Sequence, residues 1–272
     1  TLSGYISHST GFKAISTNLG ANATVYAGLP MDPSIYFANP EEAENFEVGF
    51  KKTFSNGYLN MSFFHMAVEG YQSNLFIGTG FNLVNIGEQT NKGVEIDSLF
   101  FLNENFVLTF AASYIDSTYN DFKNGPCDRT FVPPASDDCP IVNGGPARVK
   151  DFTGRTPSGV PELAVTVSGT YTFNLTENMT GYIRGEYVYE DEYQATDAVP
   201  VEVPGAIRKV GTLNASLGVK DSASGFSLML WGRNINDDEF IYTGFNVPGS
   251  PGSYAGYPVV PKMWGLTLTR EF

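Results

Sequence analysis

The sequence predicts an all-β protein, an antiparallel transmembrane β-barrel of which about ten strands lie in this chain. Three observations support this. Apolar and polar residues alternate along several segments, the connections alternate between short and long, and no run of about 18 or more apolar residues occurs. The last observation excludes an ordinary transmembrane helix. Barrel strands place every second residue toward lipid, so the near-neutral mean hydropathy suits a barrel.

The clearest alternation runs from Leu163 to Leu175, where the odd positions are apolar, aromatic or glycine and the even positions are small or polar. This pattern predicts one lipid-facing and one water-facing side. Similar segments predict strands near 1–10, 43–54, 58–75, 83–102, 106–120, 162–174, 179–193, 207–220, 226–243 and 262–272.

The connections between these segments fall into two groups. Short ones lie at 55–57, 103–105, 176–178 and 221–225, and they are rich in residues that tolerate tight turns. Long ones lie near 10–42, 121–160, 194–206 and 244–260, with a shorter one near 77–82. Strict alternation of this kind is typical of periplasmic turns below and extracellular loops above an outer membrane.

Charge and cysteine content narrow the function classes. The net charge of −13 and the lack of clustered Lys and Arg exclude a nucleic-acid partner. Cys127 and Cys139 lie close together in a Pro/Gly/Asp-rich segment, which predicts a disulfide and passage through an oxidising compartment. The alternative is two free thiols, and no His lies beside them to suggest zinc.

The final segment predicts an amphipathic closing strand. Trp264, Leu266, Leu268 and Phe272 alternate with smaller or polar residues, and Arg270 can extend its long side chain to the headgroups. A closing strand that ends in Phe resembles the signal that the barrel assembly machinery recognises. The alternative is an edge strand of a soluble protein.

Several stretches resemble the carboxyl-terminal barrel of TonB-dependent receptors. The resemblance spans nearly the whole chain in family order, and each stretch has a counterpart in the family. They are "GFKA" at Gly11 to Ala14, "NPEEAENFEVGFKKTFSNGYLNMSFFH" from Asn39 to His65, "NIGEQTNKGVEID" from Asn85 to Asp97, "LMLWGRNINDDEF" from Leu228 to Phe240, and the closing "WGLTLTREF".

The resemblance implies that residues 1–272 are the carboxyl-terminal part of a plugged 22-stranded barrel and correspond to its last ten strands. The plug domain, its TonB-contacting box and the earlier strands would lie outside this chain. The implied partners are a TonB-type energising complex acting through the plug, the barrel assembly machinery, outer-membrane lipid and lipopolysaccharide, and a small-molecule ligand. The implied location is the bacterial outer membrane. A closed barrel of ten strands is the alternative to a fragment.

The sequence gives little support for catalysis. His8 and His65 lie on separate strands, and no nucleophile, zinc or phosphate-loop motif is present, so we expect no enzyme, cofactor or metal centre. The acidic clusters at 190–192 and 237–239 could hold calcium, with solvated rim carboxylates as the alternative.

The predicted ligand surface is aromatic and lies in or beside the long connections. Tyrosine and arginine combine flat contact area with hydrogen-bond donors, which suits chelates, sugars or ring compounds. Each residue could instead pack a loop or the membrane belt. The candidates are Tyr119, Phe122, Arg129, Phe131, Tyr193, Tyr254 and Tyr257.

The leading hypothesis is therefore TonB-dependent import of a scarce nutrient, with a ferric siderophore as the family's default ligand. This segment would supply barrel wall and capture loops. The alternatives are a passive outer-membrane channel or adhesin-like barrel, and a secreted β-sandwich binding module.

Overall fold

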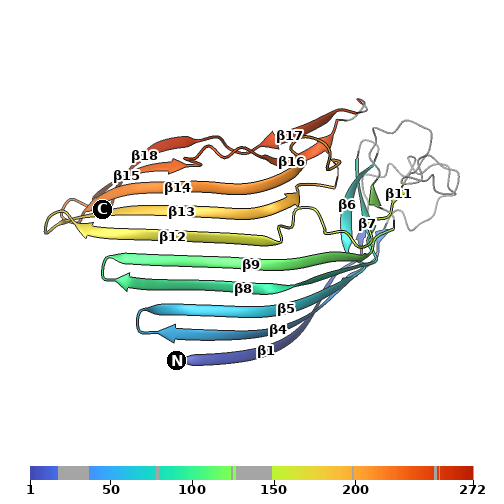
Figure 1. The fold of residues 1–272 in the computed structure, drawn as a ribbon, viewed down its shortest axis with the longest axis horizontal. Coiled ribbons are helices and arrows are strands. Elements are labelled where there is room, and N and C mark those ends of the chain that lie inside the picture. Colours follow the sequence, from blue (N-terminus) through green and yellow to red (C-terminus); the bar gives the residue numbers. More distant parts are fainter. Residues whose placement is uncertain are drawn as a thin grey trace.

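A computed structural model describes residues 1–17, 37–77, 80–123, 125–126, 149–197, 199–247, 250 and 252–271. Its main feature is one antiparallel sheet of ten strands, each paired with its neighbours in chain order (Figure 1). The strands are β1 (Leu2–Lys13), β4 (Glu41–Phe54), β5 (Gly57–Glu69), β8 (Glu88–Asn103), β9 (Phe106–Asp121), β12 (Leu163–Asn174), β13 (Met179–Gln194), β14 (Ile207–Asp221), β15 (Phe226–Arg233) and β18 (Met263–Arg270). The prediction of about ten antiparallel strands is confirmed.

The two ends of the sheet differ in their connections. The turns β4–β5, β8–β9, β12–β13 and β14–β15 are short and lie at one end, together with both chain termini (Figure 1). All the long connections lie at the other end, as the sequence predicts. We call the end with the long connections the rim and the other the turn end.

Four two-stranded pairs lie at the rim. They are β6 (Gln72–Ile77) with β7 (Gly80–Asn85), β16 (Ile241–Asn246) with β17 (Tyr254–Pro258), β2 (Ser16–Thr17) with β3 (Phe37–Ala38), and β10 (Gly125–Pro126) with β11 (Val149–Lys150). The predicted strand near 58–75 is therefore interrupted. Gly70 has a φ of 63°, which ends β5 and lets the chain rise into the β6–β7 hairpin.

The pairing register gives the sheet two chemically different faces. Residues directly opposite one another in an antiparallel pair lie on the same face. The outer face is apolar along every strand, and many of its large side chains are exposed, including Phe46, Phe50, Phe63, Ile183, Leu217, Leu230 and Leu266. A water-soluble domain would bury such side chains, whereas a lipid-facing wall leaves them uncovered.

The segment Leu163 to Leu175 follows this division. Tyr171 on the outer face is 46% exposed, and Val165 and Val167 are half-buried. Ser168 on the other face is only 2% exposed and its hydroxyl lies 2.6 Å from the Thr109 hydroxyl. The residues that we expect to face lipid are not enclosed in a protein core.

Glycines lie opposite large aromatic rings at several points of the sheet. A Cβ at Gly49 would come within 2.2 Å of the Tyr5 ring, and one at Gly265 within 2.1 Å of the Trp231 ring. The absence of a side chain lets each ring lie flat across the neighbouring strand. These pairs fix register and cover the backbone at the two edges of the sheet.

Among the described residues, no helix has the length and apolarity needed to cross a membrane.

Candidate functional site

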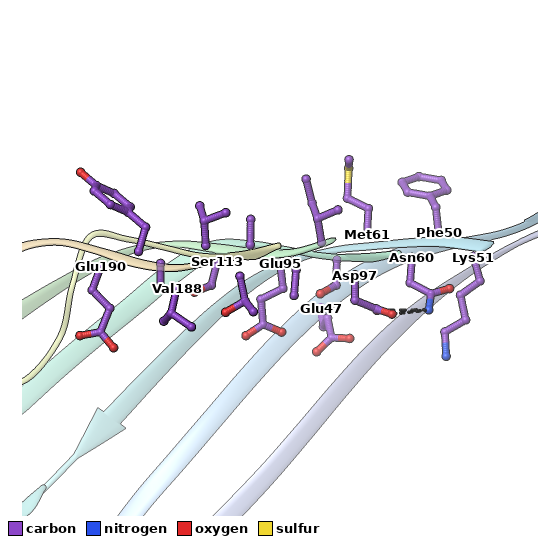
Figure 2. A pocket seen from close by; sticks show the side chains of 18 of the residues that line it. Glu47, Phe50, Lys51, Asn60, Met61, Glu95, Asp97, Ser113, Val188 and Glu190 are labelled. Carbon is purple, nitrogen blue, oxygen red and sulfur yellow. Dashed lines mark hydrogen bonds between the residues drawn. The ribbon is translucent and has the colours of Figure 1, made fainter. Parts of the chain in front are cut away.

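The inner face of the sheet is a polar wall. Figure 2 shows Glu47, Glu95, Asp97 and Glu190 pointing to one side, whereas Phe50 and Met61 point to the other. These acids come from β4, β8 and β13 and line a hollow of about 510 Å³. Such a surface suits water and polar groups in the interior of a barrel.

Hydrogen bonds hold Asp97 and Glu47 in place on the inner wall. The Asn60 amide donates to Asp97 at 3.1 Å (Figure 2), and the Tyr5 hydroxyl donates to Glu47. The Lys51 ammonium lies 5.5 Å from the centre of the Tyr5 ring. The wall therefore presents ordered carboxylates and would favour a basic or hydrogen-bond-donating surface in the interior.

An aromatic cluster lies at the rim where β9 leaves the sheet. Tyr119 and Phe122 are 5% and 3% exposed and pack edge to face with ring centres 5.0 Å apart. Phe122 packs on Phe152 in the same way at 5.3 Å, and Ile86 completes the buried cluster. Two of the predicted ligand residues are thus brought together, as part of the packing that holds segment 149–155 against β9.

Tyr193 belongs to a second rim cluster, centred on Arg208. The Arg208 guanidinium lies 5.3 Å from the Tyr193 ring centre and 4.9 Å from those of Phe240 and Tyr242. Its Nη2 lies 3.0 Å from the Glu190 carboxylate, to which the Tyr193 hydroxyl donates at 2.5 Å. Because these residues come from β13, β14 and segment 240–242, the cluster ties three parts of the rim together.

Tyr254 and Tyr257 lie on β17, which pairs with β16 in a hairpin at the rim. The Tyr257 side chain is exposed, and its ring centre lies 5.8 Å from that of Phe245 on β16. Tyr254 is half-buried. Of the predicted ligand residues that the structure describes, Tyr257 is the one most open to solvent.

The segment after β13 contacts both the connection after β9 and the β16–β17 hairpin. The Asp197 amide donates to the Ser158 hydroxyl at 3.1 Å, and the Gly159 amide donates to the Gln194 carbonyl at 2.8 Å. Val199 lies close to Gly244 on β16. A Cβ added at Gly244 would be 3.1 Å from a methyl group of Val199. The connections after β9, β13 and β15 therefore form one packed rim.

Burial affects the acid and phenol groups of this rim. It raises the pKa of Asp197, which the Ser158 hydrogen bond and the Arg155 charge lower only in part. Burial also raises the pKa of Tyr71, and the charges of Glu41 and Asp197 raise it further. An ionised Asp197 thus disfavours a second negative charge in its neighbourhood.

The sequence reasoning missed Arg208, Arg155 and Asp197. Arg208 lies near the start of an alternating strand, in "AIRKV", and the sequence there gives no sign of its partners. The rings around it become neighbours only because the register shifts between Glu190 and Tyr193 and segment 240–242 folds back. Because Tyr193, Phe240 and Tyr242 are far from Arg208 in the sequence, no local pattern could have predicted this cluster.

Some predicted site residues lie outside the described residues. They are Arg129, Phe131, Phe272 and the two cysteines, Cys127 and Cys139. The predicted disulfide therefore stays a prediction. Of the closing-strand residues, Trp264, Leu266 and Leu268 are exposed on the outer face of β18, and the Arg270 guanidinium lies 4.9 Å from the Phe226 ring centre.

The acidic cluster at 237–239 has protein partners. Asp237 lies 3.2 Å from the Lys262 ammonium, and Asp238 accepts the Gly211 amide at 2.7 Å. Within the described ranges, no group of three or more His, Cys, Asp or Glu side chains is arranged to hold a metal ion.

Residues 1–235 match the protein family described as TonB dependent receptor-like, beta-barrel. No curated protein matches the chain.

Solved structures share the fold. The ferric yersiniabactin uptake receptor FyuA from Yersinia pestis aligns with a TM-score of 0.70 and 16% identity over 100% of this chain and 35% of its own. The ferric-catecholate import receptor Fiu from E. coli K12 aligns with a TM-score of 0.62 and 17% identity, over 100% and 33%. The copper transporter OprC aligns with a TM-score of 0.60 and 9% identity, over 100% and 37%. The chain spans about a third of the length of these structures.

Proposed function

Because the chain belongs to the TonB-dependent receptor β-barrel family, we propose that the complete protein imports a scarce nutrient across the bacterial outer membrane, with a ferric siderophore as its ligand. The family consists of transport receptors in that membrane. The observation that carries the proposal is the family match over residues 1–235, together with a sheet that is apolar outside and polar inside.

In this proposal the chain supplies barrel wall and capture loops. The aromatic residues of the rim, with Tyr257 the most exposed, would meet a chelate arriving from outside, since flat rings and hydroxyl groups suit ring-bearing chelators. Arg129 and Phe131 belong to the same proposed surface. The ordered acids of the inner wall would contact a plug domain encoded before Thr1, through which a TonB-type complex would act.

The ferric siderophore is proposed because FyuA is described as a ferric yersiniabactin uptake receptor and Fiu as a ferric-catecholate import receptor, whereas OprC is described as a copper transporter. Proteins that share this barrel fold are thus described with different cargoes, so the ligand of this protein has to be tested directly.

The test is transport by the full-length receptor in a Gram-negative strain that lacks its own siderophore receptors. We expect uptake of radiolabelled iron from at least one ferric catecholate, hydroxamate or mixed chelate, and loss of uptake when the TonB-contacting segment is deleted. Uptake that survives this deletion would indicate a passive channel. Uptake of copper or cobalamin, with none of iron chelates, would overturn the siderophore proposal alone.

We also propose that the barrel assembly machinery recognises segment 263–272, with Trp264, Leu266, Leu268 and Phe272 as the signal. Replacing Phe272 by Ala should lower the fraction of heat-modifiable, membrane-inserted receptor on gels. An unchanged fraction would count against this role.

A further inference from the structure

The outer face of the sheet carries a groove beside the rim end of β14. The groove has a volume of about 800 Å³ and lies between β13, β14 and the two legs of the β15–β18 connection. Clefts of this size are typical of sites for small molecules. We propose that the groove binds a soluble primary amine, in its protonated ammonium form, that carries an apolar chain or ring.

The early end of β15 creates this groove. β15 pairs with β14 only over residues 215–220 of β14 and then leaves the sheet. Beyond that point side chains of the connection replace the strand, and the Asp238 carboxylate accepts the Gly211 amide at 2.7 Å. A loop therefore runs beside this part of β14, and the groove lies along it.

The groove opens on the outer face and is separate from the inner wall. Tyr187, which lines it, is the register partner of Leu213, and both side chains are exposed on the outer face. A ligand in the groove would therefore reach the receptor from the barrel exterior. The site would add a binding function to the proposed import of a chelate through the lumen.

Three oxygen acceptors of the groove have unused capacity. Among the described residues, neither the Tyr187 hydroxyl nor the exposed Glu239 carboxylate has a hydrogen-bond partner. Asp238 uses one carboxylate oxygen for the Gly211 amide, and its other oxygen accepts no hydrogen bond from the described residues. A primary ammonium has three N–H donors and no acceptor, so it matches this set.

Gly211 leaves room for an ammonium between two of these acceptors. A Cβ added at Gly211 would lie 3.1 Å from the Tyr187 hydroxyl and 4.0 Å from a carboxylate oxygen of Asp238. Both groups therefore approach the space that a side chain at position 211 would fill. The exposed Tyr187 ring can also attract a cation through its face.

The charges around the groove favour a cation over an anion. Three acids and one lysine line it: Asp237, Asp238, Glu239 and Lys209. Lys262 pairs with Asp237 at 3.2 Å, and Glu192 pairs with Lys209 at 3.5 Å. In the part of the chain that the structure describes, Asp238 and Glu239 have no cationic partner. A ligand ammonium would supply the missing positive charge.

The remaining walls of the groove suit the apolar part of such an amine. Phe240, Ile241 and Val259 line the side of the connection, and Ile207 lines the side of β14. Ile241 packs against two glycines, because a Cβ at either Gly205 or Gly256 would come within 2.7 Å of its side chain. An alkyl chain or aromatic ring would cover this apolar surface.

The test is binding of dansylcadaverine, a fluorescent primary amine with an alkyl chain and an aromatic ring. The full-length receptor is placed in phosphatidylcholine nanodiscs, and fluorescence anisotropy is measured against empty nanodiscs. We expect saturable binding to the receptor. The N-acetylated probe, which has the same body without the charge, should bind at least tenfold more weakly.

Variants locate the site. Glu239→Gln should weaken binding about tenfold, and Gly211→Ala should weaken it too because the new methyl group occupies the ammonium position. Lys209→Gln should strengthen binding, since it removes the opposing cation. Glu42→Gln is the matched control and should bind like the unchanged receptor. Glu42 is also an exposed outer-face acid near the rim, on β4, and has no partner among the described residues.

Three results would overturn the proposal. They are equal binding by the receptor, Glu239→Gln and Gly211→Ala, equal binding of the acetylated probe, and loss of binding in nanodiscs that contain phosphatidylethanolamine. The last result would assign the groove to a lipid headgroup and not to a soluble amine. Heat-modifiable migration on gels confirms that each variant is folded. Because the readout is the bound amine, the result is independent of whether the receptor imports a ferric chelate.

Discussion

At the scale of single residues, Arg208 shows how a charge is held at the rim. Its guanidinium is enclosed by three rings and one carboxylate, and its buried Nε atom has no hydrogen-bond partner among the described residues. The planar guanidinium can stack on rings while it pairs with Glu190, which the ammonium of a lysine cannot do equally well. The arrangement therefore depends on arginine and not only on a positive charge.

We predict that Arg208→Met loosens the rim. The change would leave Glu190 without its cation and should cost about 1–3 kcal/mol of local stability. Hydrogen–deuterium exchange of the full-length receptor should then rise in peptides that cover 195–206 and 237–246. Arg208→Lys should have an intermediate effect, and unchanged exchange in both variants would contradict the role given to Arg208.

A second residue-scale prediction concerns pH and Asp197. Burial raises the pKa of this carboxyl group in the folded protein. At pH values between its ordinary pKa and this raised pKa, the folded protein therefore binds more protons than the unfolded chain. Its contribution to stability is therefore present at low pH and is lost as the pH rises through the raised pKa. Asp197→Asn should raise the melting temperature at pH 7 and change it little below the ordinary value of 3.8.

Asp151→Asn is the matched control with the opposite sign. Hydrogen bonds from Thr153 lower the pKa of Asp151, so its contribution is present at neutral pH and is lost as the pH falls. This variant should be less stable at pH 7 and indistinguishable at low pH. A lower melting temperature for Asp197→Asn at pH 7 would contradict the burial argument.

At the scale of elements, the end of β15 depends on Asn234. This residue has a φ of 49°, is only 4% exposed, and uses its whole side chain. Its amide group donates to the carbonyls of Asp238 at 2.8 Å and Val260 at 3.2 Å, and its oxygen accepts the Asp238 amide at 2.7 Å. Asn234 thus ends the strand and joins the two legs of the β15–β18 connection.

We predict that Asn234→Ala destabilises this connection by about 2–4 kcal/mol, because it leaves buried backbone groups unpaired and places alanine at a positive φ. Asn236→Ala removes exposed hydrogen bonds only and should have a smaller effect. The measurement is the rate of protease cleavage between 234 and 262 in the folded receptor. Equal rates for the two variants would show that Asn234 does not hold the connection.

The same element shows where sequence patterns suffice and where they do not. Alternation predicts the ten strands because a wall between lipid and water must alternate. It extends the strand near 226–243 too far, since β15 ends at Arg233. An alternation of apolar and polar residues gives no information on backbone angles. Asn234 ends the strand because its φ is positive and because its side chain bonds to Asp238 and to Val260, which lies on the returning leg of the connection. The "NIND" stretch was the available turn signal.

The rim residues were predictable in kind but not in arrangement. Tyrosines beside long connections mark a rim, and Tyr119, Phe122, Tyr193, Tyr254 and Tyr257 do lie there. Which of them are buried depends on contacts between connections that are far apart in sequence. Spacing along the chain does not contain that information.

At the scale of the whole molecule, the sheet has two terminal strands, β1 and β18, and among the described residues no pairing joins them. Lipid does not tolerate unpaired strand edges, so each strand needs a neighbour. We propose that both neighbours are earlier strands of the same barrel, encoded before Thr1, and that β1 and β18 do not meet.

We predict the outcome of cysteine pairs in the full-length receptor, in a background in which Cys127 and Cys139 are replaced by serine. Cysteines at Ser62 and Glu95, which are register partners on β5 and β8, should form a disulfide. Cysteines at Ser3, Ser7 or Ser9 combined with one at Thr267 should not. A disulfide between β1 and β18, seen as a faster-migrating band without reductant, would instead show a closed barrel of ten strands.

The placement of every long connection at one end of the sheet affects how the sequence of such a protein can evolve. Insertions, deletions and exchanges in those connections leave the hydrogen-bond ladder of the sheet untouched, because the strands are held in register by the tight turns at the opposite end. Selection at the cell surface can therefore change the sequences of these connections rapidly. The wall that separates lipid from water need not be redesigned each time.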